Sequence, residues 1–245
     1  MGKHAVPIRW QYWERDEWRE FQVTHHTIYT VLKLPSEPWQ QTDPAAGGDN
    51  IQLPWVTALD LACAWAKGAT SLDSTARMIT EGLNGSPLFA YITDEQFSSD
   101  EAFRLSDLLR SMERNDPIKV NCIDCSYTVM ALANILGCNL YAKRINAGPR
   151  TRSLLPIGGV AANPDHWIQE DSLSRHQVAW IQGPAVDGWV FDACYRLDLD
   201  LIADDDDVHV PHLATGMNFR AYRSFLVGQR SPAKVEESLR RPRVV

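Results

Sequence analysis

Residues 122–136 most limit how this chain can fold, because their sequence, CIDCSYTVMALANIL, has no consistently polar side. A helix without a polar face is normally buried on all sides. Gly137 follows, and glycine commonly ends a helix. The preceding stretch, 117–121, is predicted to be extended. The remaining elements must therefore surround one central helix, and 245 residues are enough to do so in one domain.

The rest of the chain alternates between helical and extended patterns. Apolar residues recur with a helical period in 56–67, 71–84 and 100–114, and Asp73 is the expected N-cap of the second helix, with Gly85 as its stop. Strands are predicted at 23–34, 139–145, 176–181 and 188–195. These elements predict the α+β class, with helices packed on one face of an antiparallel sheet and helix 122–136 buried between them.

Three parts of the chain are expected. Residues 1–50 form an N-terminal extension rich in tryptophan, packed on the core with those side chains buried; were they exposed, they could bind a protein partner. Residues 51–228 form the main domain, with a long loop at 146–170 and a solvated aspartate run at 204–207. Residues 229–245 form a loosely packed tail.

Composition argues against several classes of protein. The net charge of −7 disfavours a nucleic-acid-binding protein, and no run of about 18 apolar residues predicts a membrane span. The first residues lack the apolar core of a signal peptide, which favours a cytoplasmic protein or export by a machine that reads no such signal. Five cysteines, an odd number, do not suggest a disulfide framework.

Cys122, His176 and Asp192 are the candidate catalytic residues. Cys122 lies in the first turn of the predicted buried helix, where the helix dipole stabilises a thiolate and the backbone N–H groups are unpaired. His176 and Asp192 flank a predicted hairpin loop, 182–188, in which paired residue numbers add up to about 370. They can therefore lie nearly opposite each other, with Asp192 orienting the imidazole.

The same segments resemble a known family. Residues 121–137 resemble the nucleophile helix of the transglutaminase-like superfamily, in which a cysteine opens a buried helix and a glycine closes it fifteen residues later. Cys122 has that spacing to Gly137, whereas Cys125 does not. The strand RHQVAW at 175–180 resembles the family's histidine strand, and GWVFD at 188–192 resembles its aspartate strand.

The resemblance implies a papain-related catalytic domain over residues 51–228, with Cys122 as nucleophile, His176 as general base and Asp192 as the orienting acid. It implies a cysteine-dependent hydrolase or acyltransferase acting on a protein, peptide or small amide through an acyl-enzyme. No cofactor and no metal site is expected.

Three other interpretations remain open. Cys122 and Cys125 form a C-x-x-C pair between an extended segment and a helix, as in thioredoxin-like redox proteins. Cys122, Cys125, Cys138 and Cys194 could bind zinc, although structural zinc sites usually show two such pairs. Finally, the chain could be an inactive relative that only binds a partner.

Overall fold

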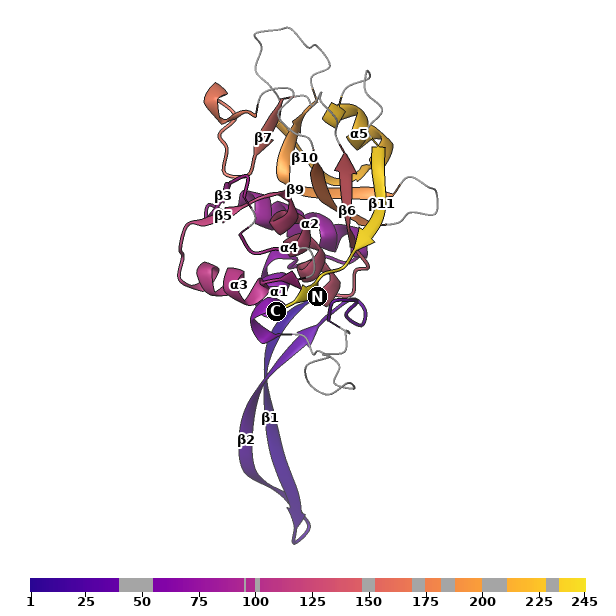
Figure 1. Cartoon of the computed structure of the whole chain (residues 1–245). Helices are drawn as coiled ribbons and strands as arrows, with labels where there is room; N and C mark the ends of the chain where they lie inside the picture. The colour runs from indigo at the N-terminus through magenta and orange to yellow at the C-terminus, as the bar shows by residue number, and fades with distance from the viewer. Residues whose placement is uncertain are drawn as a thin grey trace.

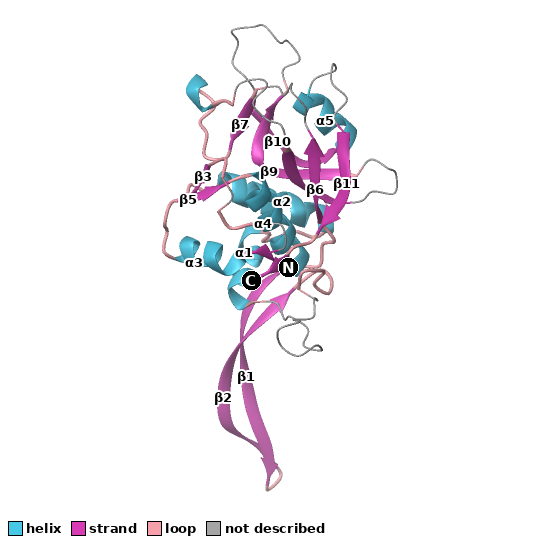
Figure 2. Ribbon diagram, in the orientation of Figure 1, coloured by secondary structure: helices cyan, strands magenta, loops and turns pink. Residues whose placement is uncertain are grey.

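The computed structural model describes residues 1–39, 55–94, 96–99, 102–146, 153–168, 175–181, 188–199, 211–227 and 234–245. It contains both α-helices and a mainly antiparallel set of strands (Figures 1 and 2). The helices are α1 (Val56–Trp65), α2 (Leu72–Gly85), α3 (Leu105–Glu113), α4 (Cys122–Ile135) and α5 (Phe219–Val227).

The main sheet is antiparallel, with strands in the order β10-β9-β8-β6-β11 and with β7 paired to β9. Its strands are β6 (Tyr141–Asn146), β7 (Leu154–Pro156), β8 (His176–Ile181), β9 (Trp189–Asp198), β10 (Pro211–Asn218) and β11 (Lys234–Arg240). Two small parallel pairs complete the domain: β3 (Phe89–Tyr91) with β5 (Ile118–Val120), and β4 (Ala102–Phe103) with β12 (Arg243–Val244).

The predicted central helix is confirmed as α4, and twelve of its fourteen residues are buried. It packs against β8 and β9. Helices α1 and α2 pack against it in turn (Figure 1). Gly137 ends the helix in a left-handed conformation with φ of +96°. A Cβ at this position would lie 2.6 Å from the backbone oxygen of Lys33, so the close approach of the N-terminal segment also requires glycine.

The other helices begin and end differently from the prediction. Ser71, not Asp73, caps α2, and its hydroxyl accepts a hydrogen bond from the backbone N–H of Ser74 in a reciprocal capping box. Gly85 is the last residue of α2 rather than a stop beyond it. The third helix begins at Leu105 instead of residue 100, because residues 102–103 pair with the C-terminal segment as β4.

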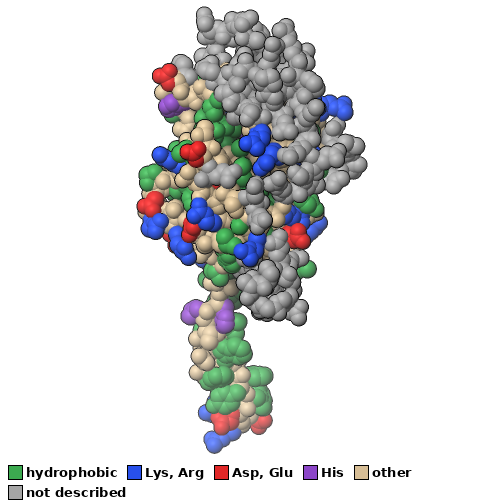
Figure 3. Space-filling model, in the orientation of Figure 1, with side chains coloured by type: hydrophobic (Ala, Val, Ile, Leu, Met, Phe, Trp, Pro, Cys, Tyr) green, Lys and Arg blue, Asp and Glu red, His purple; other side chains and the backbone are tan. Residues whose placement is uncertain are grey.

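The N-terminal segment is a long two-stranded hairpin, which we call the arm. It consists of β1 (Gly2–Glu14) and β2 (Glu17–Thr30) and projects from the domain (Figure 1). Hydrophobic side chains lie along it, with charged ones at its tip (Figure 3). Trp10, Trp13 and Trp18 are 46%, 55% and 64% exposed, so the prediction that they are buried is wrong.

The buried tryptophan of this region is Trp39, which lies after the arm. It is 1% exposed, and its indole N–H donates to the backbone oxygen of Ala131 in α4 at 2.7 Å. The base of the arm contacts α1 through one carboxylate: Lys3 of β1 and Tyr29 of β2 both donate to Asp60. The arm is thus fixed at its base, while most of its length contacts only itself.

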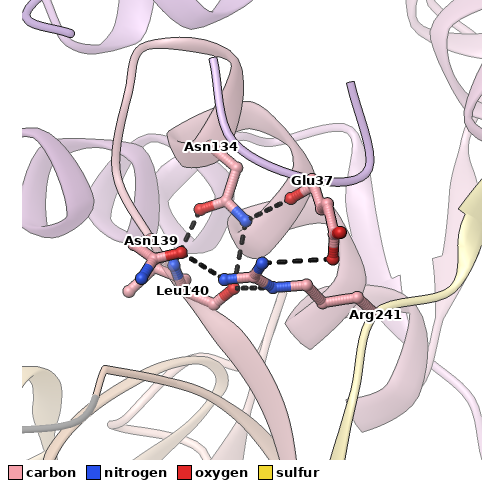
Figure 4. A network of polar contacts seen from close by, with 5 residues as sticks. All are labelled: Glu37, Asn134, Asn139, Leu140 and Arg241. Atoms are coloured by element: carbon pink, nitrogen blue, oxygen red, sulfur yellow. Dashed lines mark hydrogen bonds and ion pairs between the residues drawn. The ribbon is translucent and has the colours of Figure 1, made fainter. Parts of the chain in front are cut away.

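The C-terminal segment is not loosely packed, which corrects the sequence prediction. Of its residues the structure describes 234–245, which contain β11 and β12, and Val244 is 1% exposed. Arg241 donates to the backbone oxygen of Leu140 and to the side chains of Glu37 and Asn139 (Figure 4). In the same network, buried Asn134 of α4 bonds the backbone of Glu37 and Leu140, which joins three distant segments of the chain (Figure 4).

Two other expectations concern loops. The predicted long loop at 146–170 contains β7 and a short 3-10 turn, η2 (Pro164–His166). The aspartate run at 204–207 lies outside the described residues.

No helix in the described ranges is long and apolar enough to cross a membrane.

Candidate active site

Cys122 is the first residue of α4 and the least buried of the five cysteines; the other four are buried. The preceding residue, Asn121, caps the helix. Its side-chain oxygen accepts hydrogen bonds from the backbone N–H groups of Ile123 at 2.9 Å and Asp124 at 3.0 Å. The Asp124 carboxylate accepts from the backbone N–H of Asn121 at 3.3 Å in return. This capping box fixes the backbone on either side of the thiol.

The capping box leaves the Cys122 backbone N–H available. Neighbouring N–H groups bond to Asn121, and none of the described residues accepts from that of Cys122. Asp124 also accepts from the backbone N–H of Phe97 at 3.1 Å and from the Ser98 hydroxyl at 2.7 Å. Because Asp124 is fully buried, these bonds attach the loop at residues 96–98 to the start of α4.

His176 and Asp192 lie on adjacent strands, as predicted. Strands β8 and β9 pair in a register whose residue numbers add up to 370, and the described pairs end at Ala179 and Phe191. One step further lie Val178 and Asp192, so Asp192 is offset by two residues from His176 but faces the same side. The carboxylate oxygen Oδ2 of Asp192 lies 2.8 Å from Nε2 of His176.

The Asp192 carboxylate is held from several directions. Its Oδ1 accepts from the backbone N–H groups of Cys194 at 2.9 Å and Tyr195 at 3.3 Å. Its Oδ2 accepts from the hydroxyl of Tyr222 in α5 at 2.6 Å, in addition to its contact with His176. Tyr222 is a site residue that the sequence did not indicate, because α5 itself was not predicted and no motif marks this tyrosine.

The environment of His176 favours its protonated form. Burial opposes the charge, but the charge and hydrogen bond of Asp192 outweigh it, and the Cys122 side chain adds to them, so that the pKa rises to about 10. With Nε2 directed at Asp192, Nδ1 is the nitrogen left for Cys122. Among the described residues Nδ1 has no hydrogen bond of ordinary geometry. Such contacts commonly tighten only when substrate binds.

We expect this pKa to appear as a loss of stability at alkaline pH. The folded chain holds the His176 proton up to about pH 10, whereas the unfolded chain releases it near the ordinary value of about 6.5. The stabilisation is therefore complete below about pH 6.5 and is lost as the pH rises towards 10. Urea midpoints at about pH 6.5 and about pH 9.5 measure it. A His176→Gln variant should show a smaller fall, and an equal fall would contradict the assignment.

The remaining cysteines do not suit the redox interpretation or the zinc interpretation. Burial raises the pKa of Cys125 and Cys194, and it raises that of Cys138 to about 12. Cys138 lies elsewhere, with its thiol 3.4 Å from the backbone oxygen of Leu72. Among the described residues, which include all five cysteines, no group of three or more Cys, His, Asp or Glu side chains is placed to hold a metal.

Cys122 and His176 open into a cavity of about 410 Å³. Tyr91, Asn121, Gln177 and Tyr195 also line it, together with two arginines. The structure thus brings together Cys122, His176 and Asp192, with the first two at the cavity and Asp192 buried behind His176. Chemically, the arrangement offers a thiol, a base fixed by an acid and a backbone N–H that no described residue accepts from, beside a space for a ligand.

The chain was compared with known proteins in three ways, and no family model, curated protein or solved structure matches it.

Proposed function

We propose that the chain is a cysteine-dependent amide or ester hydrolase or acyltransferase with a papain-related, transglutaminase-like arrangement. One observation carries the proposal. Cys122 lies at the start of a buried helix and shares a cavity with His176, whose far nitrogen is held by Asp192 at 2.8 Å. Nucleophile, base and orienting acid in this order are what thiol-based acyl transfer needs.

In the first half of the proposed reaction, the Cys122 thiolate attacks the carbonyl carbon of the substrate. A carbon–sulfur bond forms, and the carbonyl π electrons move to the oxygen. When this tetrahedral intermediate collapses, the bond to the leaving nitrogen or oxygen breaks. For an amide, His176 gives the proton on Nδ1 to the leaving nitrogen, and the product is a thioester on Cys122.

In the second half, His176 takes a proton from water, and the resulting hydroxide attacks the thioester. The carbon–sulfur bond then breaks, which releases a carboxylic acid and restores the thiolate. An amine in place of water would give a new amide and make the chain an acyltransferase. A protein, peptide or small amide could supply the carbonyl group.

The developing oxyanion needs a hydrogen-bond donor. The Cys122 backbone N–H is unpaired among the described residues and lies at the positive end of α4. A donor of this kind is typically worth about a hundredfold or more in turnover. The capping box around Asn121 supports this role because it orients the backbone without occupying this N–H.

The redox alternative fits the surroundings less well. A C-x-x-C pair must expose at least one thiol and bring the second within reach of it. Cys125 is 1% exposed, burial raises the pKa of its thiol, and the thiol lies near Cys194. A disulfide exchange role would also leave the contact between His176 and Asp192 without a purpose.

The proposal is tested by which thiol reacts. Brief exposure to iodoacetamide near neutral pH should label Cys122 first, because the other four cysteines are buried. Peptide mapping by mass spectrometry identifies the labelled residue, and a Cys122→Ser variant is the control. Preferential labelling of Cys125 or Cys138 would rule out the assignment.

A second readout separates an active protein from an inactive relative. Incubation with p-nitrophenyl acetate should transfer the acetyl group to Cys122 and release nitrophenolate. The His176→Ala variant should retain Cys122 but acetylate much more slowly. An unfolded sample that acetylates Cys122 as fast as the folded protein would show that the fold does not activate this thiol.

A further inference from the structure

The cavity beside Cys122 carries a positive charge that the proposed reaction does not use. Arg144 of β6 and Arg175, immediately before β8, both line it, whereas no aspartate or glutamate among the described residues does. Neither guanidinium has an ion pair or hydrogen bond within the described part of the chain. The whole chain has a formal net charge of −7, so this local charge is opposite in sign to the average.

The two arginines are placed to act together. Arg144 is paired with Gln177 across β6 and β8. Arg175 lies two residues before Gln177, so these residues share one side of the strand by the alternation of side chains. Arg175 directly precedes the proposed base His176 in sequence, Arg144 lies on the neighbouring strand, and all three residues line the same cavity.

Gln177 provides a second, independent feature. It is 2% exposed, and its Nε2 donates to the Ser126 hydroxyl at 2.7 Å. That hydroxyl donates its own proton to the backbone oxygen of Ile123 at 2.9 Å, so it can only accept from Gln177. The amide is thereby oriented, and its Oε1 is buried and receives no hydrogen bond from the described residues. A buried acceptor without a partner is unfavourable, and an N–H of a ligand would satisfy it.

We propose that the cavity selects substrates with a carboxylate close to the carbonyl group that Cys122 attacks. Arg144 and Arg175 bind the carboxylate, since guanidinium groups match its geometry and charge. Gln177 Oε1 accepts an N–H of the same substrate. This proposal rests on the function proposed above and adds the class of substrate. The carboxylate could be the C-terminus of a peptide or an acidic side chain.

Two alkylating agents of nearly equal size test the charge. Iodoacetate carries a carboxylate next to the reacting carbon, whereas iodoacetamide is neutral. Arg144→Gln and Arg175→Gln should each lower the rate of Cys122 alkylation by iodoacetate about three- to tenfold. The rate with iodoacetamide should change by less than about twofold. Arg110→Gln is the matched control, because Arg110 is an exposed arginine on α3 that does not line the cavity.

Competition experiments identify the source of the carboxylate. Acetylglycine offers a terminal carboxylate beside an amide N–H, and acetylaspartate methylamide offers a side-chain carboxylate. At least one of them should protect Cys122 from iodoacetamide in the wild type, and the better protector shows which source the cavity accepts. Protection should weaken in both arginine variants. Acetylsarcosine, which lacks the amide N–H, should protect less than acetylglycine if Gln177 accepts that proton.

The outcomes distinguish failure of this proposal from failure of the proposed function. Unchanged iodoacetate rates in the Arg144→Gln/Arg175→Gln double variant, with normal iodoacetamide labelling, would overturn the carboxylate site alone. Absence of protection by both carboxylates would do the same. If Cys122 reacts with neither alkylating agent, the nucleophile assignment itself is wrong. An Arg144→Lys variant should retain the iodoacetate rate but lose part of the protection, because lysine preserves charge without the planar fork.

Discussion

Replacing His176 with alanine should slow alkylation of Cys122 at about pH 5.5 by on the order of a thousandfold. An ordinary cysteine has a pKa of about 8.5, so about one molecule in a thousand carries a thiolate at that pH. In the wild type, Asp192 holds the proton on His176, so a cation lies beside the thiol that is alkylated. The variant removes both the cation and the base. The measurement is the iodoacetamide rate against pH.

The control for this prediction is a histidine away from the site. His212 on β10 is exposed and does not line the cavity, so His212→Ala should have the same rate profile as the wild type. Circular dichroism should show that the His176→Ala variant remains folded. If Cys122 has the same pH profile in the wild type and in this variant, the two residues are not coupled and the mechanism proposed here is wrong.

Replacing Asp192 with asparagine should lower Cys122 reactivity about ten- to a thousandfold, less than the equivalent change in serine enzymes. The structure explains why the reactivity of Cys122 should fall. An asparagine side chain has one oxygen. It would keep accepting the hydrogen bonds that the backbone N–H groups of Cys194 and Tyr195 now donate to Oδ1. Its NH₂ would then face His176 Nε2, which would have to become an acceptor. The ring proton would move to Nδ1, the nitrogen that must take a proton from the thiol.

The same change should cost stability without unfolding the chain. The Asp192 carboxylate is 1% exposed and accepts four hydrogen bonds, so losing an acceptor should cost about 1–3 kcal/mol. Tyr222→Phe is the matched control. It removes one donor to Oδ2 but leaves the carboxylate and the tautomer of His176 intact. We therefore expect a urea midpoint below that of the wild type but nearly normal alkylation. If Asp192→Asn and Tyr222→Phe lowered the reactivity of Cys122 equally, Asp192 would not act by placing the proton on the His176 ring.

The sequence allowed the centre of the domain to be predicted because its patterns are local. Helix α4 has no consistently polar side and is followed by a glycine, and the register of β8 and β9 follows from a short loop. That register is enough to bring His176 and Asp192 to one side of the sheet. The position of Cys122 at the cavity then follows from the packing of α4 on these strands.

The missed parts depend on contacts between distant segments. The residues of β11, KVEESLR, have no strand-like alternation of apolar residues, and they form a strand because β6 offers an edge to pair with. Tyr222 reaches Asp192 from thirty residues away in sequence.

The arm turns at Arg15 and Asp16, whose φ angles are 49° and 65°. Hairpin turns of this kind usually contain Asn-Gly or Asp-Gly, so the usual sequence signal was absent.

The arm and the rest of the domain should differ in how they unfold: the arm can open locally, whereas the domain unfolds as one cooperative unit. A two-stranded hairpin with no core of its own is only marginally stable in water, and this one is joined to α1 by the two hydrogen bonds at Asp60. Its backbone amides can therefore exchange with solvent through local opening, whereas those of α4 require the whole domain to unfold. Tryptophan fluorescence should distinguish the arm from the rest of the domain. Trp10, Trp13 and Trp18 are already exposed in the native state, so their emission reports the state of the arm, while buried Trp39 reports the packing around α4.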